Sequence, residues 1–453
     1  MTGNAEPFDL LVVGAGMAGI TAANKAAAAG WKTAIVDDLP YGGTCALRGC
    51  DPKKILRRAA EVVDSARMMT DKGVVPGTLA VDWAALMRHK RGFTDPQPHN
   101  LEQSLERHGV VTHHSAATFT STDSIELDGE TVRARHFLIA AGARPRPLEF
   151  PGSQHVIDST AFLELEHLPV RLLFIGGGLI SFEFAHIAAR IGSRPLIVDH
   201  GSRPLKAFDP DLVNLLIEQG TSDGVQVRTE TSIRSIEPSG TGYRVELEHA
   251  GARETVEVDL VIHGAGREAD LDRLDLAAAD VASTARGVTV APHLQSTTNA
   301  AVYAAGDAAD TGGMPLTPIA VIEGKVAASN MLRATTIAPD YTGAPSVVFT
   351  LPELTRVGLL ESEARERGID VDVRYSDTSG WYSSYRIGAS TSAAKILVDR
   401  ANDRVVGAHL LGSEYAEVIN TIGLAMKFDI TAHQLRAALT AYPTVGSDLA
   451  SMV

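Results

Sequence analysis

Both cysteines of this 453-residue chain, Cys45 and Cys50, lie five positions apart in one short glycine-rich segment. A helix that starts near Cys45 would place Cys50 little more than one turn further on, within reach of a disulfide bond. Such a pair can cycle between dithiol and disulfide and so carry two electrons. Two buried structural cysteines are the alternative. Their closeness, directly after Gly42-Gly43-Thr44, favours a redox-active pair.

A glycine-rich motif precedes the cysteines. Gly14, Gly16 and Gly19 follow the apolar run Phe8–Val13 and open an alanine-rich segment. In a strand–turn–helix unit, the first glycine allows a tight turn and the second lets a pyrophosphate approach the backbone. The third lets the helix pack closely on the strand. Because Asp37 ends the next strand and can accept hydrogen bonds from a ribose, the motif predicts a dinucleotide site.

A second unit repeats this pattern in the middle of the chain. The strand Arg171–Ile175 is followed by Gly176 and Gly178, with Ser181 at the position where a third glycine or alanine is usual. A helix to about residue 191 and a further strand then lead to the acid Asp199. Two such units in one chain imply two dinucleotide sites.

The remaining hydrophobic patterns predict further elements outside the two glycine motifs. The expected helices are Ile20–Ala29, Ile55–Thr70, Trp83–Lys90 and Leu101–Arg107, and a hairpin is expected at Asp128-Gly129. From Ser346 onward, strands at Ala394–Val398 and Val405–Leu411 precede a helix at Glu414–Lys427. This last block is predicted to be α+β and not a third βαβ repeat.

The composition and charge of the chain limit the classes of partner that it can bind. Hydrophobic residues make up 45% and charged residues 21%, and the formal net charge is −14 with no basic block or stripe. We therefore expect neither nucleic acid nor an anionic membrane as a partner. We see no secretory leader, no apolar run of the ~18 residues that a membrane span needs, and no cluster of metal ligands. These features predict a cytoplasmic protein of two to four domains.

Several motifs occur in an order that resembles one family of enzymes. In chain order they are Gly14–Gly19, Gly42–Cys50, Ala140–Gly142, Gly176–Glu183, Ala305–Asp307 and Tyr442–Thr444. This order resembles that of the flavoprotein pyridine nucleotide-disulfide oxidoreductases, such as glutathione reductase, dihydrolipoamide dehydrogenase and mercuric reductase, over nearly the whole chain. The resemblance implies an α/β fold with two Rossmann-like dinucleotide-binding domains, for FAD and NAD(P), plus a C-terminal α+β dimerisation domain.

The same resemblance implies how the domains divide the chain. An FAD-binding domain is expected at 1–149 and again at 271–342, with an NAD(P)H-binding domain at 150–270 between the two parts. An interface domain is expected at 343–453, which would join two copies into a homodimer. The implied cofactors are FAD and either NADPH or NADH.

The resemblance also implies roles for individual residues. Cys50 matches the sulfur next to the flavin and Cys45 the sulfur that exchanges with substrate, while Lys53 and Glu183 match an ion pair beside the flavin N5. Considered alone, Lys53 would be assigned to a solvated helix face. A helix start at Cys45, with Arg48 and Lys53 nearby, is expected to stabilise the Cys45 thiolate. The other residues that match flavin contacts are Gly43, Thr44, Ala141, Gly142, Asp307 and Thr317.

The sequence gives two signals for the nicotinamide cofactor. Asp199 stands where an acid binds the free 2′-hydroxyl of NADH. His200, Arg203 and Lys206 fall near the basic positions that glutathione reductases use for the 2′-phosphate of NADPH. Three such groups can outweigh one acid, so the sequence slightly favours NADPH.

The C-terminal motif departs from the family pattern. The acid–base pair of the family motif His-Pro-Thr-x-x-Glu is replaced by Tyr442 and Ser447. A phenol, with an ordinary pKa near ~10, cannot cycle protons at neutral pH as an imidazole can. The departure therefore indicates either a changed substrate with a better leaving group or Tyr442 as the proton donor. Alternatively, Tyr442 only packs at the interface.

Two further departures narrow the range of substrates. Asn24 and Lys325 stand where glutathione reductases have two arginines that hold substrate carboxylates, which disfavours glutathione disulfide. The chain ends in Leu449–Val453 without the second cysteine pair of mercuric reductases, which disfavours mercuric reduction.

Three hypotheses for the function follow. The first is an FAD enzyme that reduces a small disulfide with NAD(P)H through Cys45 and Cys50. The second, motivated by the missing histidine, is a reductase of quinones, metal ions or other non-disulfide acceptors. The third is a redox-sensing flavoprotein that binds nucleotides but turns over slowly.

Overall fold

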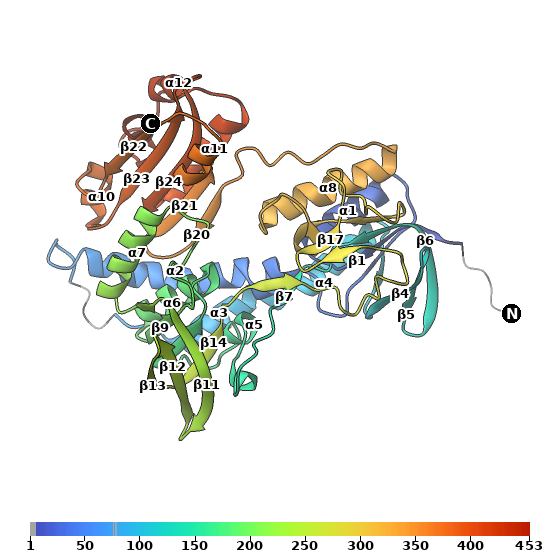
Figure 1. Cartoon of the computed structure of the whole chain (residues 1–453), viewed down its shortest axis with the longest axis horizontal. Helices are drawn as coiled ribbons and strands as arrows, with labels where there is room; N and C mark the ends of the chain where they lie inside the picture. Colours follow the sequence, from blue (N-terminus) through green and yellow to red (C-terminus); the bar gives the residue numbers. More distant parts are fainter. Residues whose placement is uncertain (1–5, 76, 78) are drawn as a thin grey trace. The chain divides into compact units, whose positions relative to one another are not determined.

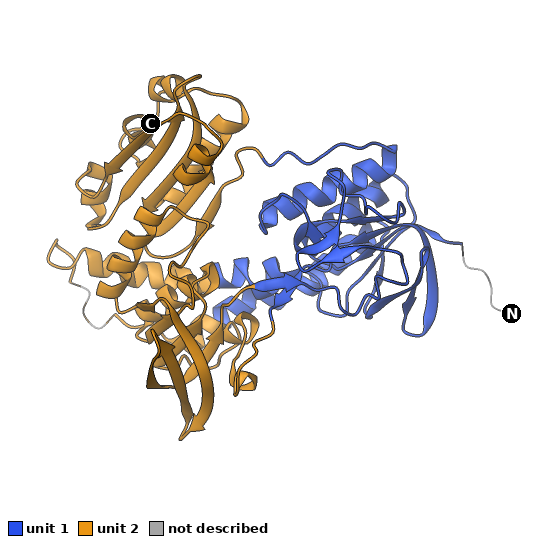
Figure 2. Cartoon of the chain, in the orientation of Figure 1, with its two compact units in different colours: residues 1–54, 88–146, 267–341 blue, residues 55–87, 147–266, 342–453 orange. Residues whose placement is uncertain are grey.

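The computed structural model describes residues 6–75, 77 and 79–453, and the chain forms two compact units. Residues 1–5, on which the expected lack of a leader partly rests, lie outside the described part. The units are coloured separately in Figure 2. Unit 1 comprises 1–54, 88–146 and 267–341, and unit 2 comprises 55–87, 147–266 and 342–453. The division into FAD, nicotinamide and interface domains stays a prediction.

Unit 1 is built on a seven-stranded sheet in the order β3-β2-β1-β6-β5-β4, with β18 also paired to β6 (Figure 1). Its parallel part consists of β1 (Phe8–Val13), β2 (Thr33–Val36), β3 (Val111–His113), β6 (Glu130–Ile139) and β18 (Val302–Ala304). The antiparallel extension is β4 (Ala117–Ser121) and β5 (Ser124–Leu127). The β1 and β2 strands are apolar without alternation because both faces of the parallel part are covered.

Two helices of unit 1 pack together unusually closely. They are α1 (Met17–Ala28) and α8 (Thr317–Arg333). A Cβ added to Gly324 would lie 2.3 Å from the backbone oxygen of Ala18, so only glycine permits this approach. The contact fixes the middle of α8 against the first turn of α1. The remaining helix that lies wholly in unit 1 is α4 (Gln97–Arg107), and its small strands are β7 (Ala143–Pro145), β15 (Arg267–Ala269), β16 (Ser283–Thr284), β17 (Gly287–Thr289) and β19 (Ala309–Asp310).

The cysteine segment differs from the expected helix that starts near Cys45. Thr44–Arg48 forms a single π-type turn, and the helix α2 begins only at Cys50 and runs to Met68. Gly49 separates the two with an extended φ of −155° and ψ of −100°. A Cβ at Gly49 would lie 3.0 Å from Thr44 atoms, so a glycine suits this close approach of the chain to itself. The helices α2 and α3 (Trp83–Thr94) each contribute residues to both units.

Unit 2 contains the second βαβ unit in a parallel sheet of order β10-β9-β8-β14. The strands are β8 (Arg171–Ile175), β9 (Arg194–Val198), β10 (Gln226–Arg228) and β14 (Leu260–His263), accompanied by α5 (Ser159–Phe162), α6 (Leu179–Ile191) and α7 (Pro210–Ser222). Ser181, at the third motif position, is fully buried, and a Cβ at Gly264 would lie 2.0 Å from its Oγ. The serine fits because the facing residue is a glycine. An antiparallel meander completes this part with β11 (Thr231–Ser239), β12 (Gly242–His249) and β13 (Ala252–Val258).

The C-terminal part of unit 2 is α+β, as the sequence predicts. Its five-stranded antiparallel sheet has the order β20-β21-β24-β23-β22. The strands are β20 (Ser346–Val348), β21 (Glu353–Gly358), β22 (Val371–Asp377), β23 (Ala393–Asp399) and β24 (Arg404–Gly412), and the helices are α9 (Glu361–Glu366), α10 (Tyr382–Ile387), α11 (Tyr415–Lys427), α12 (Ala432–Ala437) and α13 (Leu449–Met452). The helix α11 contacts β21 and β24 and buries Val418, Ile419 and Ile422 there. Within the described residues, the helices are all too short or too polar to cross a membrane.

Candidate functional site

The two cysteines lie side by side in unit 1. Cys45 is half-buried in the π-type turn, Cys50 is exposed at the first position of α2, and both are thiols. The Cys45 and Cys50 side chains are hydrogen-bonded to each other. The Cys50 Sγ also lies 3.7 Å from the Oγ1 of Thr317, the first residue of α8. The structure therefore brings Cys45, Cys50 and Thr317 together at one place.

The electrostatics of Cys45 differ from the sequence-based expectation. Its pKa is raised, first by the hydrogen bond with Cys50 and then by burial, while the hydrogen bond with Thr317 lowers it. Because α2 starts at Cys50, Cys45 does not occupy a helix N-terminus and receives no stabilisation from the helix dipole. The hydrogen bond with Cys50 and burial therefore favour the protonated form of Cys45.

The first glycine motif forms a cradle of bare backbone at the start of α1. Gly14 has φ +104°, and a Cβ there would lie 2.3 Å from the backbone oxygen of Ala140. A Cβ at Gly19 would lie 1.9 Å from the Gly14 oxygen, and one at Gly43 would lie 2.7 Å from the Gly16 Cα. A Cβ added to Gly16 would meet open space, and no side chain caps the helix that Gly16 begins. Free amides beside open space at a helix start fit a pyrophosphate.

Two acids lie at the ends of strands beside this cradle. The Asp37 carboxylate accepts hydrogen bonds from the backbone N–H of Ala15 at 2.7 Å and of Leu39 at 2.9 Å. Burial raises its pKa, although these backbone bonds oppose the shift. Asp307 follows β18, and burial raises its pKa too, while the Arg267 guanidinium lowers it. Both acids suit the hydroxyls of the ribose and ribitol parts of FAD.

A buried acid that sequence reasoning missed supports the Asp307 turn. Glu323 of α8 is 1% exposed and accepts hydrogen bonds from the Gly306 N–H at 2.7 Å, the Thr311 hydroxyl at 2.8 Å and the Tyr341 hydroxyl at 2.6 Å. Gly306 has φ +67°, so this carboxylate fixes a left-handed turn directly before Asp307. Its only sequence signal is an acid directly before the buried glycine of α8.

The other residues that match flavin contacts lie at strand or helix ends of unit 1. Ala141 and Gly142 follow β6, and Gly142 has φ +73°. Thr44 is exposed at the start of the π-type turn, and Gly43 before it has φ +60°. The carboxyl ends of parallel strands are where open α/β sheets bind ligands, so this placement fits FAD.

The second cradle lies in unit 2. Gly176 has φ +93° and lies close to Ala265, and Gly178 begins α6 without a side-chain cap. The buried Asp199 accepts from the Gly201 N–H at 3.2 Å, and a Cβ at Gly177 would lie 2.6 Å from its Oδ2. The carboxylate is thus held directly over the glycine turn, where a ribose would lie.

The basic residues that follow Asp199 are not equally placed. The Arg203 guanidinium donates to the backbone oxygens of Lys206 at 2.8 Å and Phe208 at 3.4 Å within its own loop. His200 is exposed, with its Nδ1 3.5 Å from Asp199, and Lys206 is exposed near Gly201. Arg203 therefore stabilises the loop, whereas the side chains of His200 and Lys206 are exposed.

Glu183 is held inside unit 2. It is 1% exposed, and its Oε1 accepts from the Phe349 N–H at 2.7 Å. The predicted partner Lys53 belongs to unit 1, so the Lys53–Glu183 pair stays a prediction. On the same helix, burial lowers the pKa of His186 well below its usual range, and its Nδ1 lies 3.1 Å from the backbone oxygen of Leu351.

The residues that replace the family acid–base pair lie in a capped turn. Tyr442 is 81% exposed in the single chain. The Ser447 hydroxyl donates to the backbone oxygen of Thr444 at 2.6 Å, so it stabilises the turn and does not orient Tyr442. Asn24 is half-buried on α1 and Lys325 is exposed on α8, and neither provides a guanidinium.

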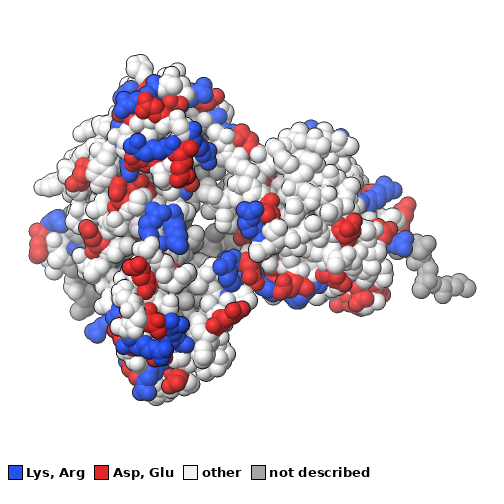
Figure 3. Space-filling model, viewed as in Figure 1, with Lys and Arg blue, Asp and Glu red and all other residues white. Residues whose placement is uncertain are grey.

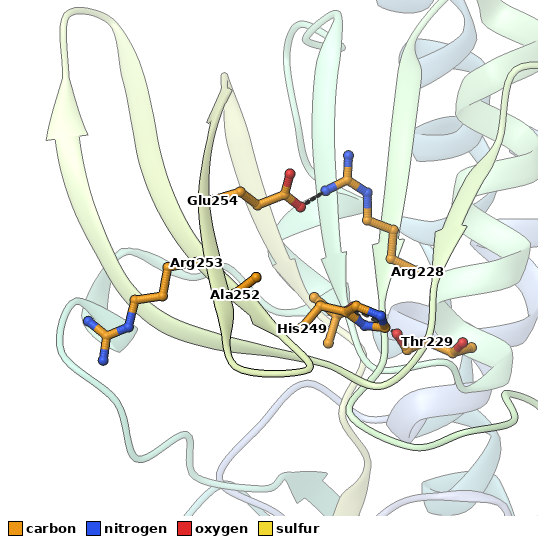
Figure 4. A pocket seen from close by; sticks show the side chains of 7 residues that line it. Arg228, Thr229, His249, Ala252, Arg253 and Glu254 are labelled. Carbon is orange, nitrogen blue, oxygen red and sulfur yellow. Dashed lines mark hydrogen bonds and ion pairs between the residues drawn. The ribbon is translucent and has the colours of Figure 1, made fainter.

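A surface cavity of about 480 Å³ lies in unit 2, at the end of β10 and the meander (Figure 4). Its lining residues are Arg228, Thr229, Thr231, His249, Ala252, Arg253 and Glu254. Arg228 and Glu254 form an ion pair, and Thr231 donates to the backbone oxygen of Thr229. Much of its polar lining is therefore satisfied internally, and the sequence motifs do not point to it.

The charged surface and the metal-ligating residues add no further site. Acidic and basic side chains are interspersed over the face shown in Figure 3. The described residues contain no group of three or more His, Cys, Asp or Glu side chains that could hold a metal ion.

Comparison with family models matches nearly the whole chain. The model for pyridine nucleotide-disulphide oxidoreductases matches residues 8–324. The model for the dimerisation domain of the same enzymes matches residues 344–453. The C-terminal α+β block therefore corresponds to the predicted dimerisation domain.

Similar curated proteins cover the full length of the chain. A glutathione reductase of Burkholderia cepacia is 30% identical over 98% of this chain and 98% of its own length. A mercuric reductase of Staphylococcus aureus is 30% identical over 98% of this chain and 81% of its own length. A dihydrolipoyl dehydrogenase of Chlamydia muridarum is 30% identical over 97% of this chain and 95% of its own length.

Solved structures give the same fold. The HOCl-induced flavoprotein disulfide reductase RclA from Escherichia coli, as a Cu(II) complex, has a TM-score of 0.88 and 25% identity, with 99% of both chains covered. RclA described without copper gives a TM-score of 0.87 and 26% identity over 98% of this chain and 99% of its own. These similarities confirm the predicted fold class of two dinucleotide-binding parts and a dimerisation domain.

Proposed function

We propose that this chain, which belongs to the pyridine nucleotide-disulphide oxidoreductase family, passes electron pairs from NAD(P)H to a small disulfide through Cys45 and Cys50. Members of this family are enzymes that use FAD and NAD(P)H. The observation that carries the proposal is the hydrogen-bonded thiol pair beside Thr317, on the same unit as the first glycine cradle. Two sulfurs this close can form a disulfide without a large backbone movement.

The chain's own residues would hold the cofactor against the sulfurs. When bound, FAD supplies the carrier that accepts a hydride from NAD(P)H and hands two electrons to the disulfide. The open backbone at Gly16 would bind the pyrophosphate, and Asp37 and Asp307 would accept hydrogen bonds from sugar hydroxyls. Lys53 and Glu183 are proposed to pair beside the flavin ring, as the family resemblance implies.

The thiols would carry out an ordinary exchange with a substrate RS–SR′. The Cys45 sulfur attacks one substrate sulfur, a mixed disulfide forms, and R′SH leaves with one proton. Cys50 then attacks the Cys45 sulfur, the second thiol RSH leaves, and the Cys45–Cys50 disulfide closes. Cys45 must lose its proton first, and its raised pKa makes this the demanding step.

The replacement of the family acid–base pair narrows the range of disulfides that we propose as acceptors. Ser447 bonds within its own turn, and Tyr442 offers a phenol in place of an imidazole. A leaving thiol of low pKa needs little help from an acid, so we propose a disulfide that is activated in this way and not glutathione disulfide. Asn24 and Lys325, which cannot form guanidinium forks, support this restriction.

A metal ion is a second candidate acceptor. RclA, whose fold this chain shares, has been solved as a Cu(II) complex. Two Cu(II) ions could each accept one electron as two thiols close to a disulfide and release two protons. Such an outer acceptor needs no protonated leaving group, so it fits the lack of a histidine at position 442.

We favour NADH over NADPH on the geometry of the second cradle. The buried Asp199 lies over the glycine turn, where its charge would accept from a 2′-hydroxyl and repel a 2′-phosphate. Arg203, one of the three groups that favoured NADPH in the sequence, donates to the backbone of its own loop.

We also propose a homodimer in the cytoplasm. The match of residues 344–453 to the dimerisation domain supports the homodimer.

Replacement of each cysteine tests the proposed function. The FAD-loaded protein, Cys45→Ser and Cys50→Ser are assayed with NADH against aromatic and alkyl disulfides, a quinone and Cu(II). Disulfide turnover should fall at least ~100-fold in either variant, since the two thiols act as a unit. Full disulfide turnover in both variants would refute the role of the pair, and quinone or Cu(II) turnover alone would favour a non-disulfide acceptor.

A further inference from the structure

Asp51 is an acid placed directly beside the thiol pair. It follows Cys50 in the first turn of α2, where its side chain is half-buried. Its carboxylate makes no hydrogen bond or ion pair with any residue that the structure describes. Some other acids on the helices of this chain are paired, such as Asp64 with Arg190 at 2.9 Å and Asp211 with Lys395 at 2.9 Å. An unpaired, half-buried carboxylate next to a reactive thiol requires a reason.

The charge of Asp51 acts on the dithiol. Cys45 is hydrogen-bonded to Cys50, and Asp51 is the covalent neighbour of Cys50 in the first turn of α2, so the carboxylate is attached directly beside the sulfur pair. Asp51 is also among the groups that raise the pKa of the Cys45 thiol. Arg48, Lys53 and Lys54 are the cations of the same segment, and Thr317 faces it from α8.

We propose that Asp51 keeps a negative charge beside the Cys45–Cys50 pair and thereby makes the pair a stronger two-electron reductant. The inference rests on the proposed function, because it concerns the same pair of sulfurs. When the pair is oxidised, two thiols become one disulfide and two electrons pass to the acceptor. With a disulfide acceptor the two protons leave on the product thiols RSH and R′SH, and with two Cu(II) ions they pass to water. Asp51 is not a reactant in this step. It changes only the equilibrium between the dithiol and the disulfide.

The direction follows from simple electrostatics. The disulfide carries no charge, whereas the reduced pair carries negative charge whenever one sulfur is a thiolate. A nearby carboxylate raises the free energy of the thiolate form and leaves the disulfide nearly unaffected. The reduced form is therefore destabilised relative to the oxidised form, and the pair gives up its electrons more readily.

A simpler role exists for an acid in the first turn of a helix. Its charge interacts favourably with the helix dipole and stabilises α2. This role predicts a small loss of stability when the charge is removed and no change in the redox equilibrium of the cysteines. The two roles therefore differ in a quantity that can be measured apart from enzyme activity.

The test compares the FAD-loaded full chain with Asp51→Asn. Each protein is equilibrated in mixtures of reduced and oxidised dithiothreitol, and its thiols are counted after acid quenching and alkylation. We expect the equilibrium in Asp51→Asn to shift about tenfold toward the dithiol, which corresponds to a potential about 30 mV higher. Asp51→Glu, which keeps the charge, should stay close to the wild type.

The matched control is Asp82→Asn. The Asp82 carboxylate also lies at a helix start, where it accepts a hydrogen bond from the Ala85 N–H at 3.0 Å. Its replacement by asparagine should leave the dithiol–disulfide equilibrium unchanged. Equal potentials for wild type, Asp51→Asn and Asp82→Asn would overturn the proposal. If Asp51→Asn does not fold, Asp51→Ser supplies a second neutral variant for the same measurement. A wild-type protein that never forms the disulfide would instead refute the proposed function.

Discussion

The Cys50 thiol lies 3.7 Å from the Thr317 hydroxyl, although 267 positions separate the two residues in the chain. The contact brings the first residue of α2 against the first residue of α8. The helix α8 also packs tightly on α1, which follows the glycine turn at Gly14 and Gly16. The starts of α2 and α8 thus meet at the sulfur pair, and unit 1 alone supplies both of these residues and the first glycine cradle.

Removal of the Thr317 hydroxyl should change the reactivity of Cys45. The hydrogen bond with Thr317 lowers the pKa of Cys45, so Thr317→Val should raise that pKa further and reduce the thiolate fraction at neutral pH. We expect alkylation of Cys45 by iodoacetamide to slow about 3- to 10-fold at pH 7.5, as for the loss of one ordinary hydrogen bond. The rate is followed by mass spectrometry, with the exposed Thr297→Val as control; unchanged kinetics would exclude the hydrogen bond.

The two glycines of the first cradle should respond differently to alanine. A Cβ at Gly16 meets open space, so Gly16→Ala should fold normally but bind FAD about tenfold or more weakly because the methyl group occupies the pyrophosphate path. A Cβ at Gly19 would lie 1.9 Å from the Gly14 oxygen, so Gly19→Ala should lose about 1–3 kcal/mol of stability. Apoprotein titration with FAD and urea unfolding separate the two effects. Tight FAD binding by Gly16→Ala would place the pyrophosphate elsewhere.

The stability of the chain should depend on the protonation of His186. Burial lowers its pKa well below 6.5, so the unfolded chain binds a proton near pH 6 that the folded chain does not. Above the pKa of the unfolded chain, ~6.5, the neutral imidazole makes its whole contribution to the free energy of unfolding. As the pH falls below ~6.5 this contribution is lost, by at most about 1.4 kcal/mol per pH unit. Urea unfolding at several pH values should show this slope in the wild type and a flatter profile in His186→Gln. The exposed His200→Gln serves as the control, and equal slopes in all three proteins would contradict the account.

The choice of nicotinamide cofactor should depend on Asp199. The wild type should use NADH with a higher kcat/KM than NADPH, because the buried carboxylate accepts from the 2′-hydroxyl and repels a 2′-phosphate. Asp199→Asn should lower kcat/KM for NADH about tenfold and so reduce the preference for NADH over NADPH. Arg203→Met should mainly loosen its loop, since its guanidinium bonds to backbone oxygens there. A wild type that prefers NADPH would show that His200 and Lys206 outweigh the acid.

The parts of the fold that the sequence predicts are those set by local patterns. Both βαβ units are present because an apolar run, a glycine turn and an alanine-rich or apolar helix follow one another directly at Gly14 and Gly176. The hairpin at Asp128-Gly129 is also present, because both residues adopt the positive φ that such a turn needs.

Features that depend on distant contacts could not be predicted in the same way. The helix after the cysteines begins at Cys50, because Gly49 breaks the expected helix. The role of Glu323 depends on Gly306, Thr311 and Tyr341, which come together only in the folded unit. The direction of the Arg203 side chain depends on loop geometry that no spacing reveals.

The most direct test of the account counts thiols during reduction. The FAD-loaded protein is treated anaerobically with one equivalent of NADH, and the thiols of Cys45 and Cys50 are counted by alkylation while the absorbance spectrum is recorded. The account predicts two new thiols per chain, a flavin that stays oxidised, and a new long-wavelength absorbance from a thiolate beside it. A flavin that bleaches while the number of thiols stays unchanged would contradict the central claim that the electron pair resides on these two sulfurs.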